Sequence, residues 1–206
     1  MNLRTALALP AFILVLQPGN IYSKEKYSDA RLPLVIVESR NGTGQAAAPK
    51  KKVSVARGIE LIVKGLDLNI NNIRFIKAPK ATDYYVYANN KASYAPSLII
   101  AANNGIQLER TVRLEKPLTR EQFAQHLDEA ILSTGDYVTN AMWLTIGDEA
   151  KFSQKALTAV QQLIKFNVVK LEKGNFRPKA FITEAEATEM IKRAAEFVQS
   201  PKEGKE

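Results

Sequence analysis

The sequence contains no cysteine and only one histidine, His126, among its 206 residues. Without cysteine there is no disulfide framework, no thiolate metal site and no cysteine nucleophile. We find no histidine pair for a metal, no serine elbow of the hydrolase kind and no phosphate-cradling glycine loop. We therefore expect a non-enzymatic protein with no metal, cofactor or catalytic residue. For His126 we expect a surface or partly packed histidine, with catalysis as the alternative. For Glu184, Glu186 and Glu189 we expect a solvated first helical turn, with a glycosidase pair as the alternative.

Long apolar runs are also scarce, and the one that stands out lies at Ala6–Leu16, preceded by Arg4. This pattern is typical of a secretory signal peptide over residues 1–23. Ile21 and Ser23 match the cleavage rule less well than two alanines, so an uncleaved anchor is the alternative. The run is shorter than the roughly 20 residues of a membrane span. We expect a secreted protein with no membrane span once the signal is removed.

Acidic residues are outnumbered by basic ones, 21 to 29. Removal of residues 1–23 takes away Arg4 alone, which leaves 28 basic residues and a net charge of +7. A basic exported protein is attracted to anionic wall polymers or lipid headgroups, although the charge also serves solubility. Basic and aromatic residues do not interleave as in single-strand binders, so we expect no nucleic acid partner.

Hydroxyl residues recur at Ser54, Thr119 and Thr183, at separations of 65 and 64 residues. Each precedes apolar residues with helical spacing, which predicts amphipathic helices beginning at these positions. Regular spacing of similar helix starts indicates a repeat protein. The predicted fold class is mainly α.

Two further helices are predicted over residues 98–104 and 156–166, ending at Gly105 and Asn167. Gly and Asn tolerate the left-handed conformation just beyond a helix end. A complete unit is thus a helix, a left-handed stop, a loop and a capped helix. The predicted organisation is an extended arm over residues 24–52, a partial first unit over 53–68, a second over 69–136, a third over 137–199 and a frayed tail over 200–206.

Thr119 with Gln122, and Thr183 with Glu186, have the spacing of capping boxes, in which each side chain satisfies a free backbone N–H. Capping does not account for the residue after the cap. We expect this residue to point outward, with no structural reason for the arginine found at position 120 in the second unit.

These features resemble the S-layer homology family, whose units carry a Gly-x-Phe-x-Pro loop and then an apolar residue followed by Thr-Arg-x-Glu. The matching residues are Gly174, Phe176, Pro178, Ile182, Thr183 and Glu186 in the third unit, Thr119 and Arg120 in the second, and the lead-in from Trp143 to Asp148. The similarity spans residues 53–198.

The resemblance implies about two and a half helical units packed around a pseudo-threefold axis. It also implies a cell-wall or cell-surface location and binding of an anionic, often pyruvylated, wall polysaccharide or peptidoglycan-linked polymer in the grooves between units. The ligand-binding residues that it implies are Arg120, Thr119, Gln122, Thr183, Glu186 and Gly174. The oligomeric state is left open.

Several positions depart from the family pattern: Glu184 and Val55 replace the arginine, and Gln122 and Arg57 replace the glutamate. Neither valine nor glutamate can hold a carboxylate as an arginine fork does. The alternative is therefore a secreted structural or protein-interaction module that no longer binds carbohydrate.

The connection over residues 67–93 carries three tyrosines, including Tyr85 and Tyr87, beside Ile73, Phe75 and Ile76. We expect these residues to pack the loop onto the core, with a sugar-stacking platform as the alternative.

Overall fold

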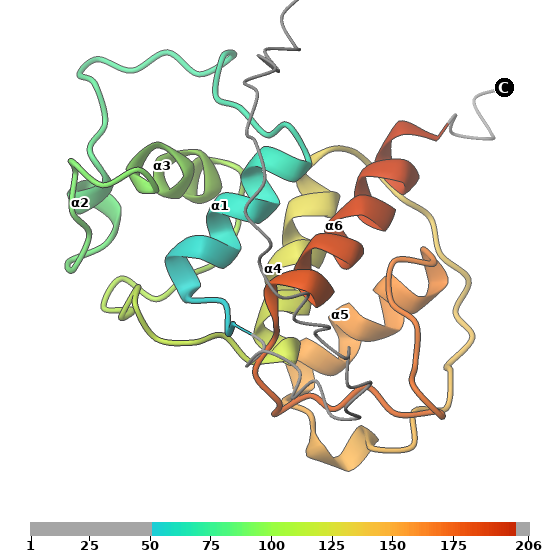
Figure 1. The fold of residues 1–206 in the computed structure, drawn as a ribbon. Coiled ribbons are helices and arrows are strands. Elements are labelled where there is room, and N and C mark those ends of the chain that lie inside the picture. Colours follow the sequence, from blue (N-terminus) through green and yellow to red (C-terminus); the bar gives the residue numbers. More distant parts are fainter. Residues whose placement is uncertain (1–50, 201–206) are drawn as a thin grey trace, which may run out of the picture. The chain divides into compact units, whose positions relative to one another are not determined.

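The computed structural model describes residues 51–200. Within this range the regular secondary structure consists of helices, and the β pairing is limited to isolated bridges (Figure 1). The elements are α1 (Val55–Gly65), α2 (Ala81–Tyr84), α3 (Ala95–Asn103), α4 (Arg120–Ser133), the 3₁₀ helix η1 (Glu149–Lys151), α5 (Gln154–Lys165) and α6 (Glu184–Gln199). The protein is mainly α, as predicted. The predictions of a signal peptide at 1–23, of an arm up to residue 50 and of a tail beyond residue 200 lie outside the described residues.

The three predicted helix starts are confirmed. The side chains of Ser54, Thr119 and Thr183 each accept a hydrogen bond from the backbone N–H three residues later, at the first turns of α1, α4 and α6. In the last two helices, Gln122 and Glu186 return a side-chain oxygen to the backbone N–H of the cap, which completes both capping boxes.

The predicted helix stops are confirmed as well. Gly105, after α3, has φ 77°, and Asn167, after α5, has φ 58°. The next residue in each case is buried and donates its N–H back to a carbonyl in the last turn, Ile106 to Ala101 and Val168 to Leu163. The left-handed residue thus turns an apolar side chain back onto its own helix.

The segments that lead into the three capped helices meet in a ring of backbone hydrogen bonds. Val53 donates its N–H to the Ile182 carbonyl at 3.1 Å, Ile182 donates to Leu118 at 3.1 Å, and Leu118 donates to Val53 at 2.8 Å. All three side chains are buried. Each segment pairs with the other two through isolated bridges, and no strand forms within residues 51–200.

The helices that follow this ring pack against one another: α1, α4 and α6 are in mutual contact, while α3 packs on α1 and α5 packs on α4. The described residues belong to a single compact unit. Its largest fully buried apolar side chains come from the helices and from the ring segments: Phe123, Phe176, Ile59, Ile62, Leu98, Leu114, Leu118, Leu127, Ile131, Leu163 and Ile182. Each amphipathic stripe therefore faces one shared core.

The prediction that the connection over 67–93 packs onto the core is only partly correct. Tyr85 is buried, but Ile73, Phe75 and Ile76 are 40%, 36% and 110% exposed. Their segment has no regular secondary structure and runs away from α1 and α3 (Figure 1). None of the helices within residues 51–200 combines the length and the apolar character needed to cross a bilayer.

Candidate functional site between α4 and α6

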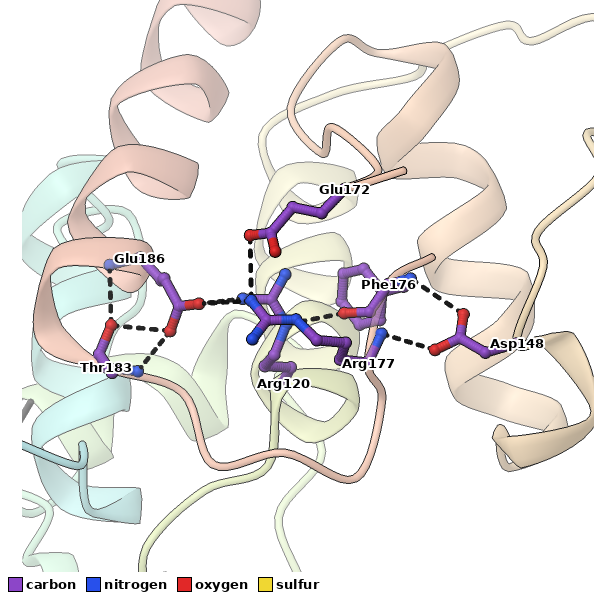
Figure 2. A network of polar contacts seen from close by, with 7 residues as sticks. All are labelled: Arg120, Asp148, Glu172, Phe176, Arg177, Thr183 and Glu186. Carbon is purple, nitrogen blue, oxygen red and sulfur yellow. Dashed lines mark hydrogen bonds and ion pairs between the residues drawn. The ribbon is translucent and has the colours of Figure 1, made fainter. Parts of the chain in front are cut away.

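Arg120 lies where the first turn of α4 meets the loop that precedes α6, and the prediction that it points outward is wrong. The residue is 6% exposed. Its Nε donates to the Phe176 carbonyl at 2.8 Å, and its Nη1 lies 2.7 Å from Glu186 Oε1 (Figure 2). Its own backbone N–H donates to the Ala180 carbonyl at 2.8 Å. Arg120 therefore has a structural reason to be arginine, because it joins the first turn of α4 to α6 and to the loop before α6.

Glu186 is shared between a helix cap and two guanidinium groups. Its Oε2 accepts from Thr183, while its Oε1 contacts both Arg120 and Arg177, the latter at 3.2 Å. Burial alone would raise the pKa of Glu186, but the Thr183 hydrogen bonds and the two cations outweigh it and lower that pKa. Burial lowers the pKa of the Arg120 guanidinium, and the neighbouring Glu186 carboxylate opposes this shift.

The loop before α6 contains a tight turn at residues 172–175. Glu172 and Asn175 exchange two backbone hydrogen bonds, while Lys173 and Gly174 between them have φ 50° and 79°. Two consecutive positive φ angles define the kind of two-residue turn that favours glycine. The predicted site residue Gly174 thus serves the backbone, and its carbonyl accepts from the Gly147 N–H at 2.8 Å.

Asp148 holds the next part of this loop in place (Figure 2). Its Oδ1 accepts the backbone N–H of Phe176 at 2.9 Å, and its Oδ2 accepts that of Arg177 at 2.7 Å. Asp148 is buried, and Arg177 has φ 63°. The carboxylate satisfies two backbone donors in a stretch where no helix or sheet could do so.

Phe176 forms the floor below Arg120. The ring is fully buried and stacks on Phe152, with 5.4 Å between ring centroids. The Arg120 guanidinium carbon lies 4.8 Å from the centre of the Phe176 ring, within the range of a cation–π contact. The aromatic residue of the Gly-x-Phe-x-Pro loop and the arginine therefore position each other.

A groove of about 260 Å³ opens beside this network, and we call it the α4–α6 groove. Arg120 lines one side. Residues 169–172 and the outer face of α6 line the rest, with Lys170, Glu172, Glu186, Glu189 and Arg193 as the charged members. Arg193 pairs with Glu189 at 2.7 Å, whereas Lys170 is exposed and has no ion pair within residues 51–200. Lys170 is thus the cation most available to a ligand.

The six predicted site residues do not gather in one place. Arg120 and Glu186 line the α4–α6 groove, and Gln122 lines a second groove of about 460 Å³ together with Val55 and His126. Thr119 and Thr183 act as helix caps, and Gly174 forms the turn. Lys170 and Arg193 were missed by the sequence analysis. Only the Glu189–Arg193 spacing, an i,i+4 pair on a helix, could have indicated one of them.

The junction between α6 and α1 repeats the Arg120–Glu186 contact with the charges exchanged. Glu184 follows the cap of α6, and its Oε1 lies 2.6 Å from Nη2 of Arg57, which stands three residues after the cap of α1. Arg120 and Glu186 occupy the same two positions in α4 and α6. Two departures from the family pattern therefore compensate each other, because the ion pair survives with its polarity reversed.

The third junction, between α1 and α4, is neutral: Val55 and Gln122 occupy the corresponding positions and line the second groove. His126 in this groove is buried, with Nδ1 3.2 Å from Glu129 Oε2. The three junctions thus present three different surfaces to a ligand.

The carboxylates in the first two turns of α6 are all ion-paired, Glu184 with Arg57, Glu186 with Arg120 and Arg177, and Glu189 with Arg193. Within residues 51–200, no cluster of three His, Cys, Asp or Glu residues is arranged to hold a metal ion. The α4–α6 groove is lined by three basic and three acidic side chains. Arg120 and Arg193 are paired with Glu186 and Glu189, so among the described residues of the groove Lys170 is the cation left to attract an anionic ligand.

Comparison with known proteins found a similarity for one part of the chain, residues 145–188. No curated protein matches the sequence. A family model, that of the S-layer homology domain, matches residues 145–188. The matched segment contains Asp148, the turn at 172–175 and the Thr183–Glu186 capping box, and it ends within α6. The resemblance read from the third unit is therefore confirmed, and residues 145–188 are identified as an S-layer homology segment.

Proposed function

We propose that this protein associates with the cell envelope by binding an anionic cell-wall polysaccharide, or a peptidoglycan-linked polymer, in the α4–α6 groove. The observation that carries the proposal is that the S-layer homology segment forms most of the groove wall, including Lys170 and Glu172. An S-layer homology segment supports association with the cell surface in general. Lys170, which makes no ion pair within residues 51–200, favours a polymer with carboxylate or phosphate groups.

The proposal includes secretion, for which residues 1–23 carry the sequence support. It also includes packing of the units around a pseudo-threefold axis. The ring formed by Val53, Leu118 and Ile182 supports this arrangement, because each residue donates to one of the others and accepts from the third.

The binding role is assigned to one junction. A negative ligand would meet the unpaired Lys170 in the α4–α6 groove, beside Arg120 and Arg193, which are paired with Glu186 and Glu189. At the α1–α4 junction it would meet Val55 in place of an arginine, and at the α6–α1 junction the residue after the cap is Glu184. Neither Val55 nor Glu184 can offer a carboxylate the two parallel donors of an arginine fork.

A second candidate is a structural or protein-interaction module that does not bind carbohydrate. The observation that favours it is the burial of Arg120, whose side chain is already engaged by Glu186 and the Phe176 carbonyl. In both cases we propose that the protein is not an enzyme, since the acids of α6 are held in ion pairs.

Sedimentation with wall sacculi, before and after the wall polysaccharide is stripped, separates the two candidates. We expect the full-length protein to pellet with intact sacculi and to stay in solution with stripped ones. Lys170→Gln should weaken pelleting, whereas Lys192→Gln, which removes the same charge from an exposed position of α6 outside the groove, should not. Equal pelleting with both preparations would favour the structural module.

A further inference from the structure

A second surface of the molecule lies far along the chain from the S-layer homology segment, in the loop over residues 69–80. Three of its large apolar side chains, Ile73, Phe75 and Ile76, are exposed, and Ile76 is fully so. They fall within four consecutive residues. Isolated exposed apolar residues are common, but a contiguous group on a monomer marks an interaction site.

The same loop is basic throughout. Residues 69–80 contain Arg74, Lys77 and Lys80 and no acidic residue. Arg74 and Lys77 are exposed and make no ion pair within residues 51–200. The connection between α4 and α5 carries three acidic residues, Asp136, Asp148 and Glu149, and one basic residue, Lys151. The apolar group therefore lies among cations whose charge is not neutralised nearby.

Both ends of the loop are fixed to the body of the protein. At the first end, the Asn104 side chain donates to the Asn69 carbonyl at 3.0 Å, and Ile73 closes a turn by donating to Ile70 at 3.0 Å. At the second end, the backbone N–H of Lys80 donates to Asp83 Oδ2 at 2.8 Å, at the start of α2. Residues 73–77 thus form the tip of a loop whose ends are held by hydrogen bonds. A loop held in this way loses less conformational entropy when it binds a partner.

The chemistry of the tip fits one kind of partner. Aliphatic side chains offer no hydrogen bond to sugar hydroxyls, and only Phe75 offers a ring for stacking. A bilayer with anionic headgroups offers phosphates to the cations and acyl chains to the apolar side chains at the same interface. An anionic bilayer can therefore bind both the apolar and the basic side chains of the tip, whereas an anionic polysaccharide can bind only the basic ones.

We propose that residues 73–77 form a tip that inserts into the surface of a lipid bilayer rich in anionic headgroups. Ile73, Phe75 and Ile76 enter the boundary between headgroups and acyl chains, and Arg74 and Lys77 contact the lipid phosphates. This surface does not depend on the α4–α6 groove, so either proposal can fail without the other.

The absence of cysteine gives a direct test, because a single introduced cysteine can be labelled with a polarity-sensitive fluorophore. Ile76→Cys places the label at the tip. Val138→Cys is the matched control, since Val138 is also fully exposed but lies in the connection between α4 and α5. The full-length protein is mixed with vesicles of phosphatidylglycerol or of phosphatidylcholine. A local label reports the tip itself, whatever other part of the chain contacts the vesicle.

We expect a blue shift at position 76 with phosphatidylglycerol vesicles, little shift with phosphatidylcholine, and none at position 138 with either. Arg74→Gln and Lys77→Gln should each lower the vesicle partition coefficient reported by this label about fivefold at low salt. The control pair Lys151→Gln and Lys192→Gln, on exposed positions elsewhere, should have little effect.

Phe75→Ser, read through the same label, should lower the partition coefficient by about tenfold or more, because the ring no longer leaves water on insertion. Circular dichroism should show the same helix content and melting temperature for each variant as for its parent. A label that stays in water with all vesicles, or that shifts equally at positions 76 and 138, would overturn the proposal. A shift caused by wall polymer but not by vesicles would assign the tip to the wall.

Discussion

At the residue scale, Arg120 shows how a charged group is kept in a buried position. Its guanidinium donates to a carboxylate and to a carbonyl, and it lies over the Phe176 ring. A buried charge is tolerated when such partners replace water, and removal of one partner leaves the others unsatisfied. The residue is therefore a part of the fold as well as of the groove wall.

Arg120→Ala should destabilise the protein by about 2–4 kcal/mol, because Glu186 and the Phe176 carbonyl lose their partner. Arg120→Lys should recover part of the loss, since an ammonium can reach one partner but not both. Urea denaturation followed by circular dichroism measures both. Arg57→Ala is the control, because Arg57 forms the corresponding ion pair with Glu184 but is exposed. This variant should lower the free energy of unfolding much less. An unchanged midpoint for Arg120→Ala would contradict the structural role.

Asp128 is a second residue whose environment decides its chemistry. It is buried, and within residues 51–200 its Oδ1 finds no hydrogen-bond partner. It lies seven residues after Glu121, on the same side of α4, and Glu121 accepts from the Ser153 N–H at the start of α5. Burial, with the Glu129 charge as a second cause, raises the pKa of Asp128 from 3.8 to about 7.

This raised pKa predicts that stability falls as the pH rises. The folded protein holds the Asp128 proton up to about pH 7, whereas the unfolded chain releases it near pH 3.8. The contribution is complete below pH 3.8 and is lost progressively as the pH rises to 7, at up to about 1.4 kcal/mol per pH unit.

Asp128→Asn should flatten the stability profile between pH 4 and 8, because an amide does not titrate. The measurement is the free energy of unfolding at several pH values, with Asp136→Asn, at an exposed position, as the control. Parallel profiles for the wild type and Asp128→Asn would show that Asp128 does not titrate in this range.

At the scale of the element, each capped helix begins with the same local arrangement and then meets its neighbour through a different pair. The Arg120–Glu186 and Glu184–Arg57 pairs occupy equivalent positions with opposite polarity. A glutamate after the cap therefore does not by itself weaken the junction. It is accommodated because the partner helix carries arginine where the other units have Gln122 or Glu186.

Reversal of the α6–α1 pair tests this compensation. Arg57→Glu and Glu184→Arg should each destabilise the protein, since each places like charges together. The double variant should recover the part of the loss that belongs to this pair, but not the part that comes from the contact of Arg57 with Glu60. The effect should shrink at high salt because the pair is exposed. A double variant whose loss equals the sum of the two single losses would mean that the two residues do not interact in solution.

At the scale of the whole molecule, the ring of Val53, Leu118 and Ile182 joins segments that are more than 60 residues apart in sequence. The three helices that follow the ring share one core. Loss of packing at the ring should therefore affect the whole described unit rather than one repeat.

Leu118→Ala should lower the free energy of unfolding by about 2–5 kcal/mol and leave a single cooperative transition. Leu132→Ala removes the same atoms from a side chain that is 42% exposed, and it should cost far less. Thermal unfolding followed by circular dichroism, and by the fluorescence of Trp143, the only tryptophan, gives the comparison. Two separate transitions would indicate repeats that unfold independently.

Local chemistry explains what could be predicted from the sequence. The caps at Thr119 and Thr183 and the stops at Gly105 and Asn167 depend on hydrogen bonds and backbone angles within a few residues. Such features require particular residue types at fixed spacings in the sequence. These spacings predicted the capped helix starts, the left-handed stops and the mainly α class. Gly174 was assigned to the ligand site, but it serves the turn.

The sequence by itself therefore determined the capped starts of α1, α4 and α6, the left-handed stops after α3 and α5, and the resemblance of residues 145–188 to the S-layer homology domain. Only the tertiary structure decided that Arg120 is buried, that Arg57 and Glu184 pair, and that Ile73, Phe75 and Ile76 remain exposed. The reason is the distance along the chain: the partners of Arg120 lie 56 and 66 residues away, and Arg57 lies 127 residues from Glu184. Burial and pairing at such separations depend on how the units pack, which no local spacing encodes.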